Sequence, residues 1–586
     1  MIKTLMKQIG QYKKDSILAP VYAAAEVIME ILIPFVTAAI IDEGIQAGNM
    51  QKVLEYGAVM IVLALLSLFF GIQAGKKAAS ASTGFACNLR ESMYKNIQTF
   101  SFSNIDKFST AGLVTRMTTD VTNLQNAFQM IIRIAVRAPM TMICSMVMCF
   151  VISVRLSLIF LVALVVLAIA LLYIMLHAMP VFQEVFSKYD DLNASVQENV
   201  TAIRVVKAFV REDFENRKFG KAAEVLCKLF VKAESFVVCN APIMMTVIFS
   251  SMLGLSWMGA QLIVAGELST GNLMSLFSYV LSMMMSLMMV SMVLVMLTIS
   301  TASAKRIAEV LNEKADLTDD EKPIMEVTDG SIDFNHVSFS YKAGTGEDTL
   351  KDIDLHIKAG ETIGIIGGTG CGKSSFVNLI SRLYDVTEGS ICVGGVDVRK
   401  YDMEVLRDKV AVVLQKNVLF SGTILDNLRW GKADATEEEC RQVCELACAD
   451  EFIERFPDKY NTYIEQGGNN VSGGQKQRLC IARALLKDPK VLILDDSTSA
   501  VDTATDAKIR AAFATKIPGT TKLIISQRIS SVQDADRILV LEDGRISGLA
   551  PHEELLASNQ IYREIYNVQI QSGGDFDQKM QEGGQA

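Results

Sequence analysis

A glycine-rich loop with a lysine and a serine lies near the middle of the chain and has the composition needed to bind phosphate groups. The apolar residues 363–366 run into GGTGCGKS, which fits the pattern G-x-x-x-x-G-K-[ST] at every required position. Glycines let backbone N–H groups close around phosphate oxygens, Lys373 neutralises their charge, and Ser374 offers a hydroxyl to Mg²⁺. We predict a strand before this loop and, after it, a helix whose positive end faces the anion. The candidate ATP-binding residues here are Gly367, Gly368, Thr369, Gly370, Cys371, Gly372, Lys373, Ser374 and Ser375.

Two carboxylates follow another apolar run, about 120 residues further along. Residues 491–494 read VLIL and lead directly into Asp495 and Asp496. A buried strand places Asp495 at the carboxyl edge of a sheet, where it can hold Mg²⁺ beside nucleotide phosphates. Asp496 must then reach past the metal and orient a water for attack on the γ-phosphorus. The pattern predicts an ATP site with Mg²⁺ as cofactor.

The part of the chain before about residue 300 is of a different kind, because its apolar stretches are long enough to cross a bilayer. The 586 residues are 50% hydrophobic and have a mean hydropathy of +0.30, which is high for a soluble protein of this size. We predict a membrane α-helical bundle of six transmembrane helices with long cytoplasmic extensions, fused to an α/β P-loop domain. The membrane segments are expected near residues 17–41, 56–75, 134–153, 157–178, 238–263 and 273–297.

Positive charges predict the orientation of these segments. Basic residues gather around 13–14, 76–77 and 90–116, whereas the short loops 42–55 and 264–272 carry few. By the positive-inside tendency, both termini and the soluble domain are cytoplasmic, in a multi-pass protein of the cell membrane. The net charge of −9 and the absence of a basic stripe argue against nucleic acid as a partner. Eleven irregularly spaced cysteines predict reduced thiols rather than a disulfide framework.

Changes in composition divide the chain into four parts. We expect a transmembrane domain at 1–311, a charged linker at 312–330, a nucleotide-binding domain at 331–570 and a disordered tail at 571–586. Two breaks interrupt the polar helical extensions of the first part, near 106–112 and 202–210. Each break could present a short helix to the soluble domain.

The segment 471–475, VSGGQ, is followed by a helix carrying Arg478 and Arg483 and then by the VLILDD strand, and it resembles the signature of ABC transporter ATPase domains. With six membrane helices upstream, the chain is similar to a half-transporter of the exporter-type (type IV) ABC fold over about residues 15–565. The resemblance implies a subunit of an ATP-driven exporter that moves hydrophobic or amphipathic compounds, such as drugs, lipids or peptides.

The same resemblance assigns roles to single residues. Tyr341 matches the aromatic residue that stacks on adenine, although a buried strand tyrosine is the alternative. Gln415 matches the glutamine that touches Mg²⁺, so the implied metal ligands are Ser374, Gln415 and Asp495. Asp502 matches the loop that links two ATP sites, and the two breaks match the coupling helices, the second of which docks on the opposite subunit. The signature residues, which serve the partner's site, are Ser472, Gly473, Gly474 and Gln475.

Two positions depart from the family pattern. Asp496 stands where the family has Glu, and the shorter side chain falls short by about 1 Å, a misplacement that can cost roughly 10²-fold in rate. Gln527 stands where the family has His, and an amide cannot become charged. The chain thus resembles the degenerate-site subunit of bacterial heterodimeric multidrug exporters, with a partner that carries the intact Glu and His. The alternative is that both residues are tolerated variants of a full hydrolase.

The cargo is less well defined by the sequence. The last two membrane segments are rich in methionine, which suits either apolar binding surfaces or helix packing. Arg133 and Arg137 either line a cavity entrance or extend towards lipid headgroups. Two other functions stay open: an importer built on the exporter fold, as in some siderophore importers, and a regulatory nucleotide-binding subunit that moves nothing itself.

Overall fold

The structure, a computed structural model, describes residues 1–341 and 348–571, so the predicted tail lies outside the described residues except for Gln571. These residues divide into two compact units. The first comprises Met1–Gln98 and Thr110–Glu313, and the second comprises Thr99–Ser109 together with the chain from Lys314 onward. Each unit has a hydrophobic core of its own.

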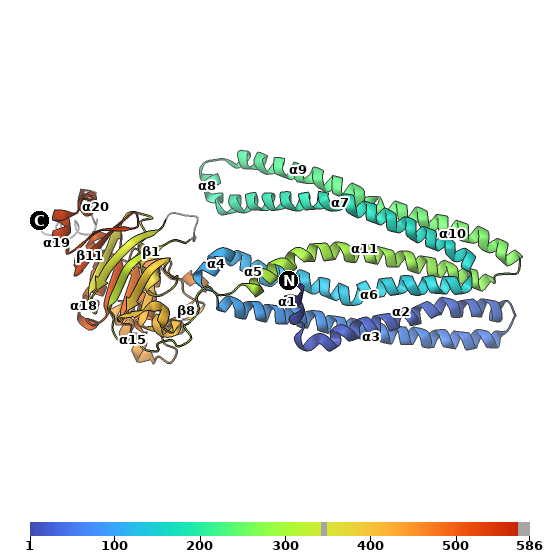
Figure 1. Ribbon diagram of the computed structural model, residues 1–586, viewed down its shortest axis with the longest axis horizontal. Helices are drawn as coiled ribbons and strands as arrows, with labels where there is room; N and C mark the ends of the chain where they lie inside the picture. The colour runs from blue at the N-terminus through green and yellow to red at the C-terminus, as the bar shows by residue number, and fades with distance from the viewer. Residues whose placement is uncertain (342–347, 572–586) are drawn as a thin grey trace. The chain divides into compact units, whose positions relative to one another are not determined.

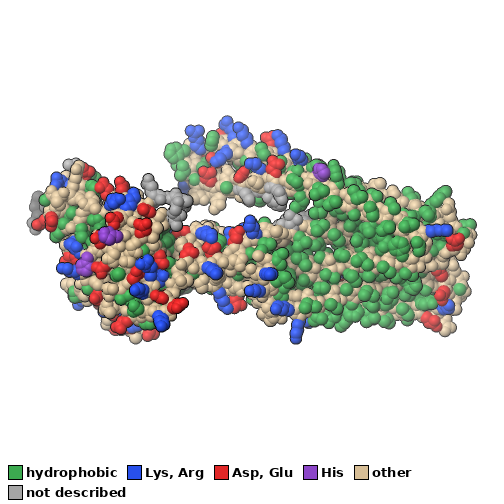
Figure 2. All heavy atoms as spheres, viewed as in Figure 1, with side chains coloured by type: hydrophobic (Ala, Val, Ile, Leu, Met, Phe, Trp, Pro, Cys, Tyr) green, Lys and Arg blue, Asp and Glu red, His purple; other side chains and the backbone are tan. Residues whose placement is uncertain are grey.

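Six helical segments in the described residues are long and apolar enough to cross a membrane, which confirms the predicted bundle (Figure 1). Hydrophobic side chains gather over one end of these helices, and charged side chains gather over the extensions (Figure 2). The 49 residues of the second long helix span about 74 Å at 1.5 Å per residue, far more than the ~30 Å hydrocarbon layer requires. The long helices are α2 (Lys13–Ala39), α3 (Met50–Gln98), α6 (Val121–Ile152), α7 (Val154–Thr201), α10 (Asn240–Val264) and α11 (Thr270–Asn312).

Shorter helices connect or extend these six. At the amino terminus, Leu5 of α1 and Ile9 just after it are buried, while Ile2 and Met6 are exposed. The α7 and α9 helices pack on one another through Val185, Leu226 and Ala233 and form a hairpin that ends in α8 (Figure 1). The bounds are α1 (Ile2–Lys7), η1 (Gly10–Tyr12), η2 (Ile40–Ile45), α5 (Thr110–Thr115), η3 (Arg116–Asp120), α8 (Ile203–Ala208) and α9 (Glu212–Val238).

The two predicted breaks correspond to two short helices, although the first lies earlier than expected. Helix α4 covers Phe102–Phe108, whereas the break was expected at 106–112. It begins there because the Ser101 hydroxyl accepts from the backbone N–H of Asn104, whose side-chain oxygen accepts in return from the backbone N–H of Ser101. It ends at Phe108, before Ser109, which has a φ of 55°. The second short helix, α8, falls inside the expected range 202–210.

The second unit contains the α/β domain. Its larger sheet has the strand order β12-β11-β3-β10-β9-β6, in which all neighbours are parallel except β11 and β12. A four-stranded antiparallel sheet has the order β2-β1-β4-β5. The strands are β1 (Ile332–Phe339), β2 (Leu350–Ile357), β3 (Thr362–Gly367), β4 (Glu388–Val393), β5 (Val396–Asp397), β6 (Val410–Val413), β7 (Gly422–Thr423), β8 (Tyr463–Ile464), β9 (Val491–Asp495), β10 (Thr521–Ile525), β11 (Arg537–Glu542) and β12 (Arg545–Ala550).

The central strands are buried on both faces, as their continuous apolar runs predict. All five residues of β9 and of β10 are buried, so the carboxyl ends of both strands are held at the same sheet edge as the end of β3. Helices cover these strands: α12 (Lys373–Ile380), α13 (Met403–Lys409), α14 (Ile424–Leu428), α15 (Glu437–Leu446), α16 (Asp450–Ile453), α17 (Gly473–Leu485), α18 (Thr503–Lys516), α19 (His552–Ser558) and α20 (Gln560–Gln571).

Candidate nucleotide-binding site

The phosphate loop connects β3 to α12 and curls because its glycines take left-handed backbone angles. Gly370 has a φ of 83° and Gly372 a φ of 98°, and a Cβ on Gly372 would lie 2.8 Å from the Leu350 side chain. The loop borders a cavity of about 530 Å³. The residues around this cavity are Tyr341, Thr349, Ile366, Gly367, Gly368, Thr369, Gly370, Gly372, Lys373, Ser374, Ser375, Gln415, Gln527 and Ile565.

One residue predicted for this loop is placed differently. The Cys371 side chain is only 7% exposed and packs in the core beneath the loop, so it does not line the cavity. Any contact of Cys371 with a nucleotide would come from its backbone. Sequence reasoning in turn missed Thr349 and Ile565, because neither belongs to a motif and both reach the cavity from distant parts of the chain.

Lys373 and Tyr341 provide charge and an aromatic surface at the cavity. The Lys373 ammonium donates to the carbonyl oxygens of Gly367 at 2.9 Å and Gly368 at 2.7 Å, so the positive charge lies across the loop. The Tyr341 hydroxyl lies 2.9 Å from the Ser375 hydroxyl oxygen. Tyr341 is 51% exposed, which argues against a buried strand tyrosine and leaves its ring accessible for stacking.

The side chains predicted to hold Mg²⁺ come together at the carboxyl end of β9. Asp495 is 4% exposed and accepts a hydrogen bond from Ser374. Burial raises the pKa of Asp495 above its ordinary value, because removal from water disfavours the charged form. Gln415 Nε2 lies 3.5 Å from Asp496 Oδ2.

This donor set fits Mg²⁺, which prefers one or two carboxylates, a hydroxyl and phosphate oxygens. Asp495 is a buried anion with no side-chain cation bonded to it in the described chain, so a bound cation would compensate its desolvation. Ser374, Gln415 and Asp495 would hold the ion. When bound, Mg²⁺ neutralises phosphate charge.

The two atypical residues lie at the same edge of the sheet. Asp496 follows β9 with a φ of 47°, and its backbone N–H donates to Ile525 of β10 at 3.1 Å. Gln527 lies two residues beyond Ile525 and lines the cavity. The two residues thus follow neighbouring strands, and of the two only Gln527 lines the cavity among the described residues.

The signature is not part of this cavity. Ser472 caps α17 by accepting from the Gln475 backbone N–H at 3.3 Å, and no residue of 471–475 lines the cavity in the described chain. Ser472 and Gly473 are exposed. The structure thus places the phosphate loop, Asp495, Asp496 and Gln527 at one edge of the sheet, and the signature lies outside the cavity there.

Asp502 lies at the start of α18, in a loop held from two sides. Its carboxylate accepts from the Thr505 backbone N–H at 2.9 Å, and this bond lowers the pKa of Asp502 below its ordinary value. Gln477 of α17 accepts from the Ala500 N–H at 3.0 Å, and Arg528 donates to the carbonyl of Val501 at 3.3 Å. The loop therefore connects the signature helix to the segment that contains Gln527.

Helix α4 reaches the adenine-stacking candidate through one tyrosine. Within the second unit, the Tyr384 hydroxyl donates to Asp106 Oδ2 at 2.7 Å, and the Tyr384 ring packs edge-on against Tyr341 with centroids 5.2 Å apart. Burial, reinforced by the bond to Asp106, raises the pKa of Tyr384 above its ordinary value, so it remains a donor. A displacement of α4 would therefore be transmitted through Tyr384 to Tyr341, which lines the cavity.

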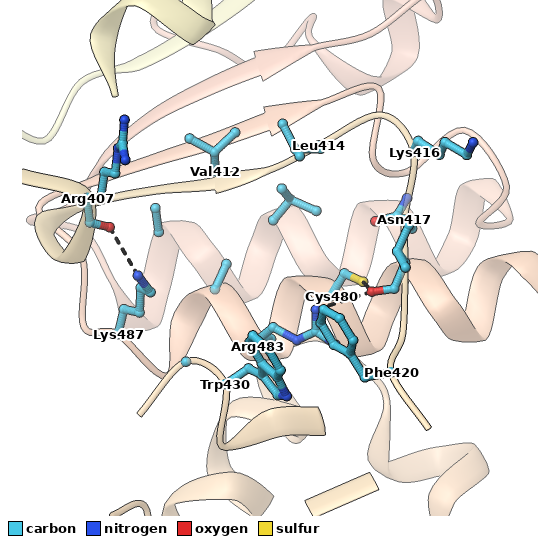
Figure 3. Close-up of a pocket in the computed structure, with 15 residues that line it drawn as sticks. Arg407, Val412, Leu414, Lys416, Asn417, Phe420, Trp430, Cys480, Arg483 and Lys487 are labelled. Carbon is cyan, nitrogen blue, oxygen red and sulfur yellow. Dashed lines mark hydrogen bonds between the residues drawn. The ribbon is translucent and has the colours of Figure 1, made fainter. Parts of the chain in front are cut away.

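A second cavity of about 290 Å³ opens elsewhere in the ATPase domain (Figure 3). Phe420 and Trp430 stack at its mouth with centroids 4.1 Å apart and are 43% and 62% exposed. Arg483 of α17 lies behind them and donates to the carbonyl of Asn427 at 2.9 Å. An exposed aromatic pair over a half-buried arginine is a surface suited to an apolar side chain of another element.

In the membrane unit, Arg137 forms ion pairs. Its guanidinium donates to Glu26 Oε1 at 2.8 Å and to Glu30 Oε2 at 2.9 Å, joining α6 to α2. Glu26 is 8% exposed. These pairs argue against an extension of Arg137 to headgroups, and Arg133 forms no ion pair among the described residues.

A six-helix membrane bundle joined to a P-loop ATPase domain defines an exporter-type half-transporter that uses ATP. The family model for the ABC transporter transmembrane region matches residues 16–315, and the ABC transporter model matches residues 350–499. The chain belongs to the ABC transporters.

Relatives match nearly the whole chain. It is 36% identical over 569 residues to the uncharacterised ABC transporter ATP-binding protein YfiB of Bacillus subtilis, covering 97% of this chain and 99% of that protein. It is 33% identical over 493 residues to an ATP-dependent lipid A-core flippase of Desulfotalea psychrophila, covering 82% and 84%. The solved structure of a bacterial Atm1-family ABC exporter with ATP bound shares the fold, with a TM-score of 0.81, 22% identity and coverage of 95% and 99%.

Proposed function

We propose that this chain is one subunit of a heterodimeric ABC exporter, to which it contributes a slow ATP site and an intact signature. The observation that carries the proposal is that Asp496 and Gln527 follow the neighbouring strands β9 and β10 at one edge of the sheet, where Gln527 lines the cavity, while the phosphate loop and the signature keep every required residue. The partner would carry Glu and His at the corresponding positions.

The physical basis is the distance over which each side chain can act. Asp496 is one methylene shorter than Glu, so its carboxylate ends about 1 Å short of a water placed for in-line attack. A misplacement of this size can lower the rate of hydrolysis roughly 10²-fold. Gln527 can donate a hydrogen bond to the γ-phosphate but cannot hold positive charge. ATP would therefore bind well in this cavity and be hydrolysed slowly.

The position of the signature supports a composite site. Since Ser472 and Gly473 are exposed and lie outside the chain's own cavity, they are available to close the partner's ATP site. The Asp502 loop is held by Gln477 and Arg528. It would then couple the closure of one ATP site to the closure of the other.

Helix α8 supports docking on a second chain. Three large apolar side chains at and beside this helix are exposed to water: Val205 at 56%, Phe209 at 73% and Val210 at 80%. A group of exposed apolar side chains marks a surface that binds another element. We propose that these side chains bind the partner's ATPase domain. The contact surface there would correspond to the one that carries the aromatic pair of Figure 3 in this chain. Helix α4, by contrast, docks within its own chain through Tyr384.

The cargo is proposed as a class only. A hydrophobic or amphipathic compound, such as a drug, lipid or peptide, fits the apolar membrane unit, and the similarity to a lipid A-core flippase favours a lipid among these. The basic loops favour cytoplasmic termini and a cytoplasmic ATPase domain in the cell membrane. Accumulation of cargo by inverted vesicles tests export against import. Cavity-lining variants of this chain that alter cargo selectivity would exclude a purely regulatory subunit.

The decisive experiment compares the two ATP sites in the assembled transporter. We expect Asp496→Asn to change steady-state ATP turnover by less than about twofold, and removal of the partner's glutamate to lower it by roughly 10²-fold or more. The reverse substitution, Asp496→Glu with Gln527→His, should raise turnover at this site. Equal losses from the two neutralising substitutions, or rapid turnover by this chain purified alone, would refute the proposal.

A further inference from the structure

The last helix of the described chain, α20, is fixed at its start. Tyr562 is fully buried, its backbone N–H donates to Asn559 Oδ1 at 2.9 Å, and its hydroxyl lies 2.6 Å from His552 Nδ1. Asn559 in turn donates to the carbonyl of Ser547 on β12 at 3.1 Å. The helix is therefore held against the edge of the large sheet and projects from a rigid base.

The other end of α20 holds the segment that contains Gln527. Gln569 Nε2 donates to the backbone carbonyl of Gln527 at 2.7 Å, and Gln569 Oε1 accepts from the backbone N–H of Ile529 at 3.0 Å. The two bonds bracket Arg528. A side-chain amide supplies both a donor and an acceptor, whereas a carboxylate supplies only acceptors and would face the Gln527 carbonyl with like charge.

The bracketed segment lies between the nucleotide cavity and the loop before α18. Gln527 lines the cavity, and Arg528 donates to the carbonyls of Val501 at 3.3 Å and Ser499 at 3.2 Å. One turn before Gln569, Ile565 of the same helix also lines the cavity. Helix α20 thus contacts the site twice, once through Ile565 and once through the backbone around Gln527.

We propose that Gln569 is a positioning residue that sets Gln527 towards the γ-phosphate, and that α20 is a structural support of the ATP site. The inference rests on the proposed function, because it requires ATP in this cavity. The two hydrogen bonds fix the backbone on both sides of Arg528 and so restrict the orientations that the Gln527 side chain can take. The contact of Gln527 with the third phosphate is therefore preorganised before ATP binds, which lowers the entropy cost of binding. ADP has no third phosphate, so its affinity does not depend on this preorganisation.

The test measures the two nucleotides separately in the assembled transporter. The full-length chain with its partner is photolabelled with 8-azido-ATP or 8-azido-ADP over a range of concentrations, and the chains are resolved by electrophoresis. We expect Gln569→Ala and Gln569→Glu to weaken half-maximal ATP labelling of this chain by about 3- to 10-fold, as for the loss of one or two hydrogen bonds, and to leave ADP labelling unchanged. Asn567→Ala, at an exposed position on the same helix, is the matched control.

The outcomes distinguish a failure of this inference from a failure of the proposed function. Equal weakening for ATP and ADP would mean that Gln569 only supports the fold, and no weakening for either would mean that the bracket does not position Gln527; both overturn the inference. If the wild-type chain is labelled by neither nucleotide, the proposed function fails and the inference fails with it. Unchanged ADP labelling in the variants shows that they are folded.

Discussion

At the scale of single residues, small differences in side-chain reach decide how the site can act. Asp495 and Asp496 are adjacent carboxylates, yet the first is buried at the end of β9 and the second is half-buried, with a φ of 47°. Burial raises the pKa of Asp495, which favours a site that gains from a bound cation. In the proposed function, Asp496 is too short to orient the attacking water as a glutamate would.

A residue-scale prediction concerns Asp502, the N-cap of α18. Asp502→Ala should lower the free energy of unfolding of the nucleotide-free protein by about 1 kcal/mol at neutral pH, whereas Asp502→Asn, which can also cap, should cost less. Because the Thr505 N–H lowers the pKa of Asp502, the charged carboxylate is the stabilising form.

The pH dependence follows from this direction. The difference between wild type and Asp502→Ala is fully present above the ordinary carboxyl pKa of about 3.9 and shrinks as pH falls through the lowered native value. Thermal unfolding in detergent at several pH values checks both statements. A difference that grows on acidification would contradict them.

At the scale of elements, short contacts join helices that are far apart in sequence. Arg137 on α6 reaches two glutamates on α2, and Glu26 keeps one buried oxygen, Oε2, without a partner among the described residues. A charge in an apolar bundle is stabilised only by its partner. The ion pairs therefore fix how α2 and α6 lie against one another.

The corresponding prediction compares two arginines one turn apart. Arg137→Ala should destabilise the membrane unit by about 3–5 kcal/mol, because it leaves Glu26 buried and unpaired, whereas Arg133→Ala should cost much less. Thermal stability of the detergent-solubilised chain, followed by size-exclusion chromatography, measures both. Adding Glu26→Gln to Arg137→Ala should recover part of the loss. Equal stability of the two arginine variants would count against a structural role for the pair.

At the scale of the whole molecule, exposed surfaces indicate what one chain lacks. The signature lies outside its own chain's cavity, and apolar side chains at and beside α8 are exposed in the described chain. An exporter-type half-transporter with such surfaces is suited to assembly with a second chain.

The prediction at this scale tests the α8 contact. Phe209→Ala should lower cargo-stimulated ATP turnover of the assembled transporter by about tenfold, as for the loss of an aromatic anchor, without weakening ATP binding. Phe219→Ala removes a ring from α9 that is also exposed, at 46% against 73% for Phe209, and should have little effect. The measurement is ATP hydrolysis with and without cargo in lipid nanodiscs. Equal losses from both substitutions would remove the special role of α8.

The sequence by itself determined the features that depend on neighbouring residues. The phosphate loop, the apolar strand before Asp495 and the six membrane segments are local patterns, because turn geometry and hydrophobic length are set within a few residues or one helix. The start of α4 is also encoded locally, in the Ser101 and Asn104 cap, although the break is expected at 106–112 and the helix covers Phe102–Phe108. The proposed roles of Asp496 and Gln527 depend on the resemblance to the family.

Only the tertiary structure decided which distant groups meet. It buried the Cys371 side chain, exposed Tyr341 and joined Arg137 to Glu26. It also placed Gln569, 42 residues away, on the backbone of Gln527. No local pattern encodes such contacts, because the packing of sheets and helices brings together side chains that are far apart in the chain.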